Sequence, residues 1–343
     1  MSTVETETRA APPTSLPGSS GKRIMVAAGR ASGELGARIA DKLGLSLTDA
    51  GLKTFTDGEV YCRYEESIRG ADIFIIQSIC GSEREGITVN DAFMELMLMV
   101  DAAVGASAHR VIAVAPLYGY SRQDKKSAPR EPISGRVIAH ALERIGIDRL
   151  LTMDLHAGQV QGFFSKPVDH MTAMPILSQY VKDQLGAENV VIISPDAGRV
   201  KLTRNFAKKI GVPYALLEKE RPAQEVAEIG YVIGDVKGKV AVIVDDIIDT
   251  GGTLAAAAQT VVDEGASAVY AVATHGIFSG DAFETLGGSP LAGIVVTDTV
   301  PLREGAPDSI RVISCADILT DSVRRIFTDD SVSEIFAGEN QLF

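Results

Sequence analysis

The run Val242–Thr253 holds the residues whose types and order are best suited to bind a ligand. An apolar stretch ends there in the adjacent acids Asp245 and Asp246. Two neighbouring carboxylates at the end of a buried strand repel each other unless a metal ion or the hydroxyl groups of a ligand accept both. The pair therefore indicates a site for a metal ion or for a ligand with several hydroxyl groups.

The segment Asp249-Thr250-Gly251-Gly252-Thr253 predicts a tight turn that leads into a helix. Its two glycines remove side chains from the path of a ligand, while backbone N–H groups and the two threonine hydroxyls would point at an anion over the helix N-terminus. The alternative is an acidic surface loop in which an Asp or a Thr caps the helix. The position of the whole run, between a buried strand and a helix, favours the anion-binding interpretation.

Two further segments carry groups that can bind phosphates or a base. Arg122 offers a planar fork of donors for a phosphate and a flat face for adenine, and Gln123 beside it is a neutral hydrogen-bonding partner. His156 ends a predicted strand, where its imidazole can reach a ligand at the edge of a sheet. Taken alone, each of these residues also fits a surface group that binds nothing.

Three more segments complete the set of candidates, which are Phe55-Thr56-Asp57-Gly58-Glu59, Asp196 and Lys219-Glu220-Arg221. The first is typical of a turn with two acids. The second follows a predicted strand, and the third places two cations two residues apart. Such turns and basic pairs are common on protein surfaces, so these segments indicate a site only in combination with the others.

Together, these segments make residues 22–343 resemble the ribose-phosphate pyrophosphokinase family. The run Asp245–Thr253 resembles the loop for phosphoribosyl pyrophosphate that this family shares with type I phosphoribosyltransferases. The simple transferases do not combine it with the other segments, namely the Arg122-Gln123 loop, His156 and the Lys219/Arg221 pair. The combination favours an enzyme that makes phosphoribosyl pyrophosphate over one that consumes it.

The resemblance implies a role for each candidate. The expected catalytic residues are Lys219 and Arg221, on a loop that closes over the reacting phosphates. The expected ATP-binding residues are Phe55, Asp57, Glu59, Arg122, Gln123 and His156, the first three contacting ATP largely from a neighbouring subunit. The expected ribose 5-phosphate residues are Arg221, Asp245, Asp246, Asp249, Thr250, Gly251, Gly252 and Thr253. The expected metal ligands are His156 and Asp196.

The implied reaction transfers the terminal diphosphate of ATP to the C1 hydroxyl of ribose 5-phosphate and releases AMP, which supplies nucleotide biosynthesis. The resemblance also implies Mg²⁺, with two ions per site of which one binds with ATP. It implies a homo-oligomer, a hexamer built from dimers, with phosphate and ADP as effectors. Two alternatives stay open, a non-catalytic regulatory homologue and a type I phosphoribosyltransferase. The first should have lost catalytic residues, and the second would need a hood for a nucleobase and no ATP site.

Two positions depart from the pattern of many family members. Arg199 stands where many members have Gly, so we expect a more cationic lining there. Ala128-Pro129 stands in a region where many members carry a further Arg. That region is tied to ATP and to regulation by phosphate in the family, so the departure concerns regulation and leaves the expected reaction unchanged.

Short apolar runs alternate with segments of helical length along the chain. The predicted strands are 23–28, 71–78, 110–116, 149–155, 189–195, 239–245, 268–274, 293–299 and 310–314. They are mostly unbroken apolar runs, as expected for strands that are covered on both faces. The predicted helices include 89–105, 134–146, 172–185, 200–210 and 253–265. This alternation predicts an α/β protein with mainly parallel sheets flanked by helices.

Two regions look like copies of one unit. The strand 110–116 leads through a cationic loop to a helix, and the strand 239–244 leads through the acidic loop 245–253 to another. Ligands of open α/β sheets sit at the carboxyl ends of strands, so both loops are candidate sites. We expect two similar phosphoribosyltransferase-type domains, at 22–168 for ATP and at 169–343 for ribose 5-phosphate, after a disordered tail at 1–21. The last helix is expected to pack back on the first domain.

Composition excludes several classes of protein. Of the 343 residues, 45% are hydrophobic and 23% are charged, which is ordinary for a globular protein and excludes disorder as the main state. No run approaches the roughly 20 apolar residues of a membrane span, and the N-terminus does not read as a secretory signal. The net charge of −12 argues against nucleic acid as a partner. Three cysteines without ligand spacing favour free thiols in the cytoplasm.

Overall fold

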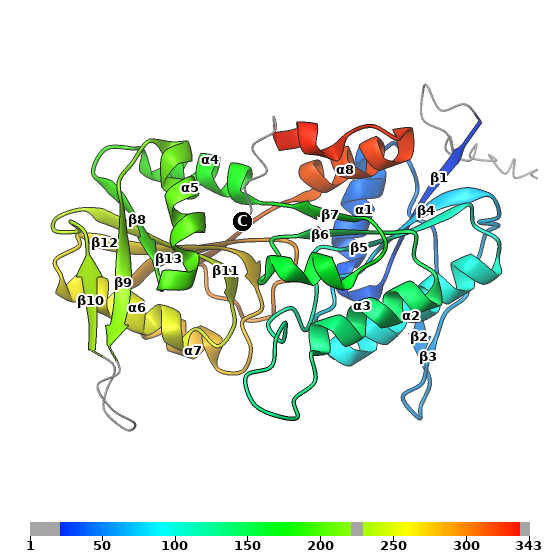
Figure 1. Cartoon of the computed structure of the whole chain (residues 1–343), viewed down its shortest axis with the longest axis horizontal. Helices are drawn as coiled ribbons and strands as arrows, with labels where there is room; N and C mark the ends of the chain where they lie inside the picture. The colour runs from blue at the N-terminus through cyan, green and yellow to red at the C-terminus, as the bar shows by residue number, and fades with distance from the viewer. Residues whose placement is uncertain (1–20, 221–228, 337–343) are drawn as a thin grey trace, which may run out of the picture.

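The computed structural model describes residues 21–220 and 229–336, which form two sheets covered by helices (Figure 1). The first sheet has five parallel strands in the order β1, β4, β5, β6, β7. They are β1 Arg23–Ala28, β4 Ala71–Ile76, β5 Arg110–Ala115, β6 Arg149–Met153 and β7 Val168–Met171. The helices of this half are α1 Gly33–Lys42, α2 Val89–Gly105 and α3 Ser134–Ile145.

The second sheet has seven strands in the order β10, β9, β8, β11, β12, β13, β14. They are β8 Val190–Ser194, β9 Tyr214–Glu220, β10 Ile229–Ile233, β11 Val240–Ile248, β12 Ala268–Gly276, β13 Leu291–Thr297 and β14 Ile310–Ile313. β10 runs antiparallel to β9, and the other neighbours are parallel. The helices that follow β7 are α4 Met174–Leu185, α5 Val200–Ile210, α6 Gly252–Asp263, α7 Ala282–Gly287 and α8 Ala316–Thr328.

Helices cover both faces of the sheets, which explains why the strands are unbroken apolar runs. All six residues of β4 are buried. Phe74 packs with α1 in one hydrophobic cluster, while Ile73 and Ile75 pack with α2 in another on the opposite face. The expected α/β class, with parallel sheets flanked by helices, is confirmed. In the part of the chain that the structure describes, no helix is long and apolar enough to cross a membrane.

The strand orders show which parts of the two halves correspond. Counted along each sheet, β1, β4, β5, β6 and β7 hold the places that β8, β11, β12, β13 and β14 hold in the other. Thr48 pairs with Ala27 on the outer side of β1, where the second sheet has β9. The strand that corresponds to β11 is therefore β4. The sequence-based pairing of the 110–116 strand with the 239–244 strand was wrong, because similar local order does not reveal position in a sheet.

Several elements differ from the sequence-based expectation for identifiable reasons. β11 continues to Ile248, so Asp245 and Asp246 lie within the strand, where pairing with β12 still holds them in extended conformation. β7 reads Val-Asp-His-Met and has no apolar run that would predict a strand. Because it pairs with β6, the first sheet extends to Met171 and crosses the expected domain boundary between residues 168 and 169.

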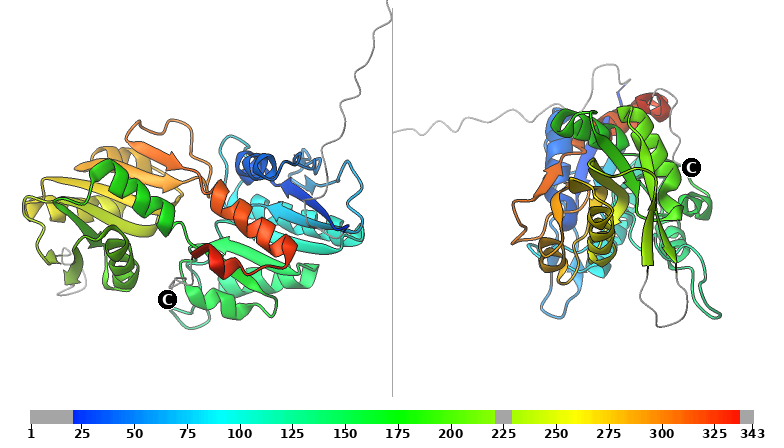
Figure 2. Two further views of the ribbon diagram at one scale, coloured as in Figure 1. Left: turned by 90° about the horizontal axis from the view of Figure 1, so that it is seen from above. Right: turned by 90° about the vertical axis from the view of Figure 1, so that its left-hand side faces the viewer.

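The last helix joins the two halves (Figure 2). Leu319, Val323 and Phe327 of α8 lie in the same hydrophobic cluster as residues of α1 and β1. Beyond the helix, Asp329 accepts hydrogen bonds from Arg110 at 2.7 Å and from Lys22 at 2.5 Å. α8 follows the second sheet in the chain and packs against the first, so it contributes to a shared core.

Candidate functional site

The acidic residues of β11 lie at a reversal of the strand order in the second sheet. From β8 the chain crosses to β9 on one side, and from β11 it crosses to β12 on the other. α5 and α6 lie in hydrophobic clusters on opposite faces of this sheet. Pairing between β8 and β11 ends at Ile243, which leaves Asp245 and Asp246 beyond the end of β8. Open α/β sheets bind ligands in such a crevice, at the carboxyl ends of the strands.

The two carboxyl groups experience different surroundings. Asp246 has a side chain that is 6% exposed, whereas that of Asp245 is 28% exposed. Burial, together with the hydrogen bond and charge of its neighbour, raises the pKa of Asp245 well above its usual value. Burial alone would also raise the pKa of Asp246, but hydrogen bonds with His156 and Asp245 and the charge of Arg199 outweigh it and lower that pKa. Negative charge therefore concentrates on Asp246.

Arg199 and His156 meet at these carboxyl groups. The Arg199 Nη2 lies 2.8 Å from an oxygen of Asp246, and its Nε lies 3.3 Å from an oxygen of Asp245. His156 comes from the first half, and its Nδ1 lies 2.9 Å from the other oxygen of Asp246 and 2.7 Å from the Arg199 Nη2. The cluster thus joins the segment after β6 to β11 and to the segment after β8.

A buried polar network holds the backbone just before His156. Asp154 has a left-handed backbone with φ of 39°, and its carboxylate accepts hydrogen bonds from the Ala173 N–H at 2.8 Å and the Thr274 hydroxyl at 2.6 Å. Burial lowers the pKa of His170 to about 4, and its Nε2 accepts a hydrogen bond from the Leu155 N–H. These bonds stabilise an unfavourable backbone that directs the chain to the cleft.

The Asp249–Thr253 segment forms a tight turn onto α6, as expected. Gly251 adopts φ of 79°, and a Cβ there would come within 2.7 Å of Leu286, so a side chain is excluded for two reasons. A Cβ at Gly252, the first residue of α6, would meet open space. The helix N-terminus is therefore uncovered on that side, where unpaired backbone N–H groups favour an anion.

The cationic loop of the first half reaches this turn. Arg122 donates to Asp249 at 2.5 Å, and this ion pair joins the two halves. Burial would raise the pKa of Asp249, but hydrogen bonds from Ser279 and Arg122 lower it. Gln123 accepts a hydrogen bond from the Ser134 hydroxyl at 2.6 Å, at the start of α3. The structure thus brings Arg122 to the expected phosphate loop and keeps Gln123 within its own half.

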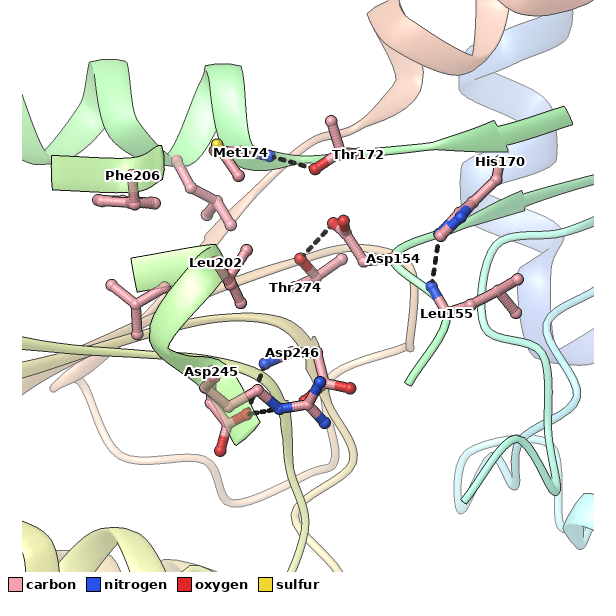
Figure 3. Close-up of a pocket in the computed structure, with 13 residues that line it drawn as sticks. Asp154, Leu155, His170, Thr172, Met174, Leu202, Phe206, Asp245, Asp246 and Thr274 are labelled. Atoms are coloured by element: carbon pink, nitrogen blue, oxygen red, sulfur yellow. Dashed lines mark hydrogen bonds and ion pairs between the residues drawn. The ribbon is translucent and has the colours of Figure 1, made fainter. Parts of the chain in front are cut away.

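A small cavity of about 60 Å³ opens beside the acidic pair (Figure 3). Asp245 and Asp246 line it from the second sheet, and Asp154 and His170 line it from the first half. A larger cavity of about 880 Å³ lies elsewhere between the halves, and its lining contains none of the candidate residues. The smaller cavity is the one that coincides with the candidate chemistry.

The other candidate residues lie apart from the acidic pair or outside the residues that the structure describes. Phe55, Asp57 and Glu59 belong to the turn of a small hairpin of β2 Lys53–Thr54 and β3 Val60–Tyr61, which projects far from β11 (Figure 1). The side chain of Asp196 accepts a hydrogen bond from the Arg199 N–H at 3.1 Å and caps a short helical turn. Lys219 lies in β9, but its side chain and the whole of Arg221 are outside the described residues.

Sequence reasoning did not find two parts of this arrangement. It noted Arg199 as a cation but had no means to bring it against both acids, since their contact spans some 46 residues of chain and depends on strand order. It also gave no role to Asp154, which bonds to Ala173 just before α4 and to Thr274 of β12. The available signal in the sequence was the position of Asp154, an acid at the end of a predicted strand and two residues before His156.

Comparisons with known proteins agree along nearly the whole chain. Residues 24–146 match the N-terminal domain of ribose phosphate pyrophosphokinase, and residues 194–337 match the phosphoribosyl synthetase-associated domain. The ribose-phosphate pyrophosphokinase of Caldanaerobacter subterraneus subsp. tengcongensis is 46% identical over 91% of this chain and 98% of its own length. Ribose-phosphate pyrophosphokinase A of Dictyostelium discoideum is 44% identical over 92% and 99%.

A solved structure gives the same result for the fold. The phosphoribosylpyrophosphate synthetase from Mycobacterium smegmatis superposes with a TM-score of 0.83 and is 39% identical, covering 90% of this chain and 100% of that one. Sequence relatives and fold therefore agree over most of both halves. On these grounds, this chain belongs to the ribose-phosphate pyrophosphokinase family.

Proposed function

We propose that this protein is a ribose-phosphate diphosphokinase, which transfers the terminal diphosphate of ATP to the C1 hydroxyl of ribose 5-phosphate and releases AMP. The observation that carries the proposal is the crevice between β8 and β11, where an acidic pair on a strand adjoins an uncovered helix N-terminus. A sugar phosphate presents hydroxyl groups that the acidic pair can bind and a phosphate that the helix N-terminus can bind. The product would supply nucleotide biosynthesis.

The acidic half of the site would bind the sugar. Asp245 and Asp246 would accept hydrogen bonds from the ribose hydroxyls, because carboxyl oxygens are good acceptors and the charge on Asp246 strengthens such bonds. The 5-phosphate would lie over the start of α6, where the residues that bind it are Asp249, Thr250, Gly251, Gly252 and Thr253. This arrangement would hold the C1 hydroxyl in a fixed direction, and orientation of this kind supplies much of the rate in phosphoryl transfer.

The cationic residues would bind the nucleotide and the moving diphosphate. Arg122, Gln123 and His156 would contact ATP from the first half. Lys219 and Arg221 would neutralise the charge that develops as the diphosphate moves, since transfers of this type depend mainly on positioning and on cations. Closure of the segment that carries Lys219 and Arg221 would exclude water, which would otherwise hydrolyse ATP.

The donor set at the crevice suits Mg²⁺, and we propose two ions per site, one of them entering with ATP. His156 and Asp196 are the proposed ligands of the nucleotide-bound ion, and the acidic pair is the proposed anchor of the second. In the described ranges, no three His, Cys, Asp or Glu side chains form a group that could hold a metal ion. Substrate phosphates and water would therefore complete the coordination, as is usual for Mg²⁺. The ions would neutralise phosphate charge.

We further propose that one active site is shared by two subunits of a homohexamer built from dimers. Phe55 is 45% exposed at the tip of a hairpin that lies far from β11, and Asp57 bonds within the same turn. An exposed aromatic residue followed by two acids fits a segment that contacts the nucleotide of a neighbouring chain. Phosphate and ADP are the proposed effectors. The three free cysteines fit a cytoplasmic location.

The reaction is tested by separating the products. Purified protein is incubated with ATP, Mg²⁺ and ribose 5-phosphate, and AMP and ADP are resolved by chromatography. We expect AMP in equal amount to phosphoribosyl pyrophosphate, and only when ribose 5-phosphate is present. Formation of ADP, or no sugar-dependent AMP, would contradict the diphosphokinase assignment. The second result would favour a regulatory homologue without activity.

The shared site is tested by mixing two inactive variants, Lys219→Ala and the double variant Asp57→Ala/Glu59→Ala. With random mixing, about a quarter of all sites combine an intact Lys219 with an intact hairpin, so about a quarter of the activity should return. A mixed preparation that contains both chains in one assembly and stays inactive would exclude the shared site. Lys208→Ala, at an exposed residue of α5, serves as the control for mixing.

A further inference from the structure

Arg199 contacts the acidic pair in a way that a solvated surface arginine does not. Its side chain is 19% exposed and lies against both Asp245 and Asp246, at 3.3 Å and 2.8 Å. The residue sits in the helical turn that leads from β8 into α5, so it lies across the crevice from the strand that carries the acids. The guanidinium thus occupies the space in front of the carboxylate oxygens.

The same guanidinium also bonds to the other half of the molecule. Its Nη1 lies 3.3 Å from the backbone oxygen of His156, and its Nη2 lies 2.7 Å from the imidazole Nδ1. Arg199 therefore connects the segment after β6 with β11, in addition to compensating charge. Removal of the guanidinium would leave one connection there, between the His156 ring and Asp246.

Two adjacent carboxyl groups repel each other when both are ionised, and a nearby cation relieves this repulsion. In the structure that cation is Arg199, and no group of three metal-ligating side chains occurs within the described ranges. A divalent cation and a guanidinium would use the same oxygen atoms of Asp245 and Asp246. Arg199 lies against one oxygen of each carboxyl group, and two cations at this position repel each other, so a divalent cation would compete with Arg199.

We propose that Arg199 is the internal counter-cation of the substrate-free protein and that a divalent cation must displace it to reach the acidic pair. The inference rests on the proposed function, because it concerns the ion that would accompany the substrates. Its consequence is that Arg199 raises the divalent-cation concentration at which the site becomes loaded, while it stabilises the empty site. Arg199 is thus a positioning residue that sets the metal requirement.

The direct test measures Mn²⁺ binding to the protein without substrates, by the electron paramagnetic resonance of free Mn²⁺. Mn²⁺ is a suitable probe because it prefers oxygen ligands, as Mg²⁺ does. We expect Arg199→Met to lower the dissociation constant by roughly 5- to 150-fold, the range of typical coupling between two binding events. Arg199→Lys keeps the charge but loses the forked guanidinium, so its dissociation constant for Mn²⁺ should lie between those of the parent and of Arg199→Met. Arg204→Met, at an exposed arginine of α5, the helix that follows Arg199, is the matched control and should bind as the parent does.

Thermal unfolding gives a second readout that does not depend on activity. In EDTA, Arg199→Met should unfold at a lower temperature than the parent and Arg204→Met, because its carboxylates lack a cation. Saturating Mn²⁺ should raise the unfolding temperature of Arg199→Met by more than that of the parent. Equal or weaker Mn²⁺ binding in Arg199→Met, or no Mn²⁺ binding in any variant, would overturn the proposal. Failure of the proposed reaction would appear separately, as absence of AMP formation by the parent protein.

Discussion

The crevice between β1 and β4 and the crevice between β8 and β11 hold the same place in the two sheets but differ in what fills them. In the first, Gln77 follows β4 and is fully buried, and a Cβ on Gly29 would lie 2.3 Å from its side chain. In the second, the corresponding strand presents Asp245 and Asp246 to a cavity. At Gly29 the first crevice is closed by the side chain of Gln77, although the larger cavity begins beside it at Arg30, whereas the second crevice is open at the acidic pair.

Both crevices contain an arginine that faces an acid, so the surroundings of the two ion pairs can be compared directly. After β1, Arg30 pairs with Glu95, which comes from α2 and is not exposed, and Gln77 donates to the same carboxylate at 2.8 Å. After β8, Arg199 pairs with Asp246 of the strand itself. In the first pair Arg30 lines the larger cavity but Glu95 is fully buried, whereas in the second pair both Arg199 and Asp246 line the small cavity. A common fold can thus hold a structural ion pair at one crevice and the proposed binding site at the other.

The largest expected effect tests the structural role of the closed crevice. Arg30→Met should lower the free energy of unfolding by about 3–5 kcal/mol, because it leaves the charge of Glu95 buried without its partner. Chemical denaturation measures this loss. Arg84→Met, whose side chain is 68% exposed, should change the same quantity by no more than about 0.5 kcal/mol. Equal losses for the two variants would show that the first crevice is not held by its ion pair.

The next effect concerns the rate of transfer. Lys219→Ala should lower kcat by about a hundredfold or more and leave ribose 5-phosphate binding nearly intact, because the cation would act on charge that develops during transfer. Steady-state kinetics measure kcat, and calorimetric titration with ribose 5-phosphate measures the affinity for the sugar. Lys208→Ala should retain the parental kcat. A kcat for Lys219→Ala within about threefold of the parent would remove Lys219 from the mechanism.

Sugar binding tests the open crevice itself. Asp245→Asn should weaken ribose 5-phosphate binding by about tenfold and lower the rate as well, since an amide N–H₂ in place of an acceptor oxygen leaves a ribose hydroxyl without its partner, at a cost of about 1–3 kcal/mol. Calorimetric titration measures the affinity. Asp263→Asn, an exposed acid on α6, should bind the sugar as the parent does. Unchanged affinity in Asp245→Asn would mean that the acidic pair does not hold the ribose.

The smallest effect concerns the ion pair that joins the two halves. Arg122 is 50% exposed and Asp249 is 25% exposed, so a double-mutant cycle on the free energy of unfolding should give a coupling of about 0.2–1 kcal/mol. Arg122→Met, Asp249→Asn and the combined variant provide the cycle. A coupling above about 2 kcal/mol would indicate that this contact is desolvated and belongs to the core between the halves, in contrast to the open crevice proposed here.

Much of the molecule follows from local sequence. The helices 89–105 and 200–210 begin and end where the pattern predicts, because a capping box at Thr88 and a left-handed Gly211 mark their ends. The buried strands follow from apolar runs, since a strand covered on both faces has no polar side. The turn at Gly251 follows as well, because glycine is strongly favoured at such a backbone angle where neighbouring atoms leave no room for a side chain.

Strand order, and with it the content of each crevice, was decided by tertiary structure. The sequence suggested that the 110–116 strand corresponds to the 239–244 strand, but pairing across the first sheet makes β4 the counterpart of β11. Asp245 and Asp246 could be identified as a candidate site from residue types alone. The partner that compensates them, Arg199, could not, because its contact requires β8 and β11 to be adjacent although β9 and β10 lie between them in the chain. Residue types determine which groups are able to bind, and long-range strand pairing determines which of them meet.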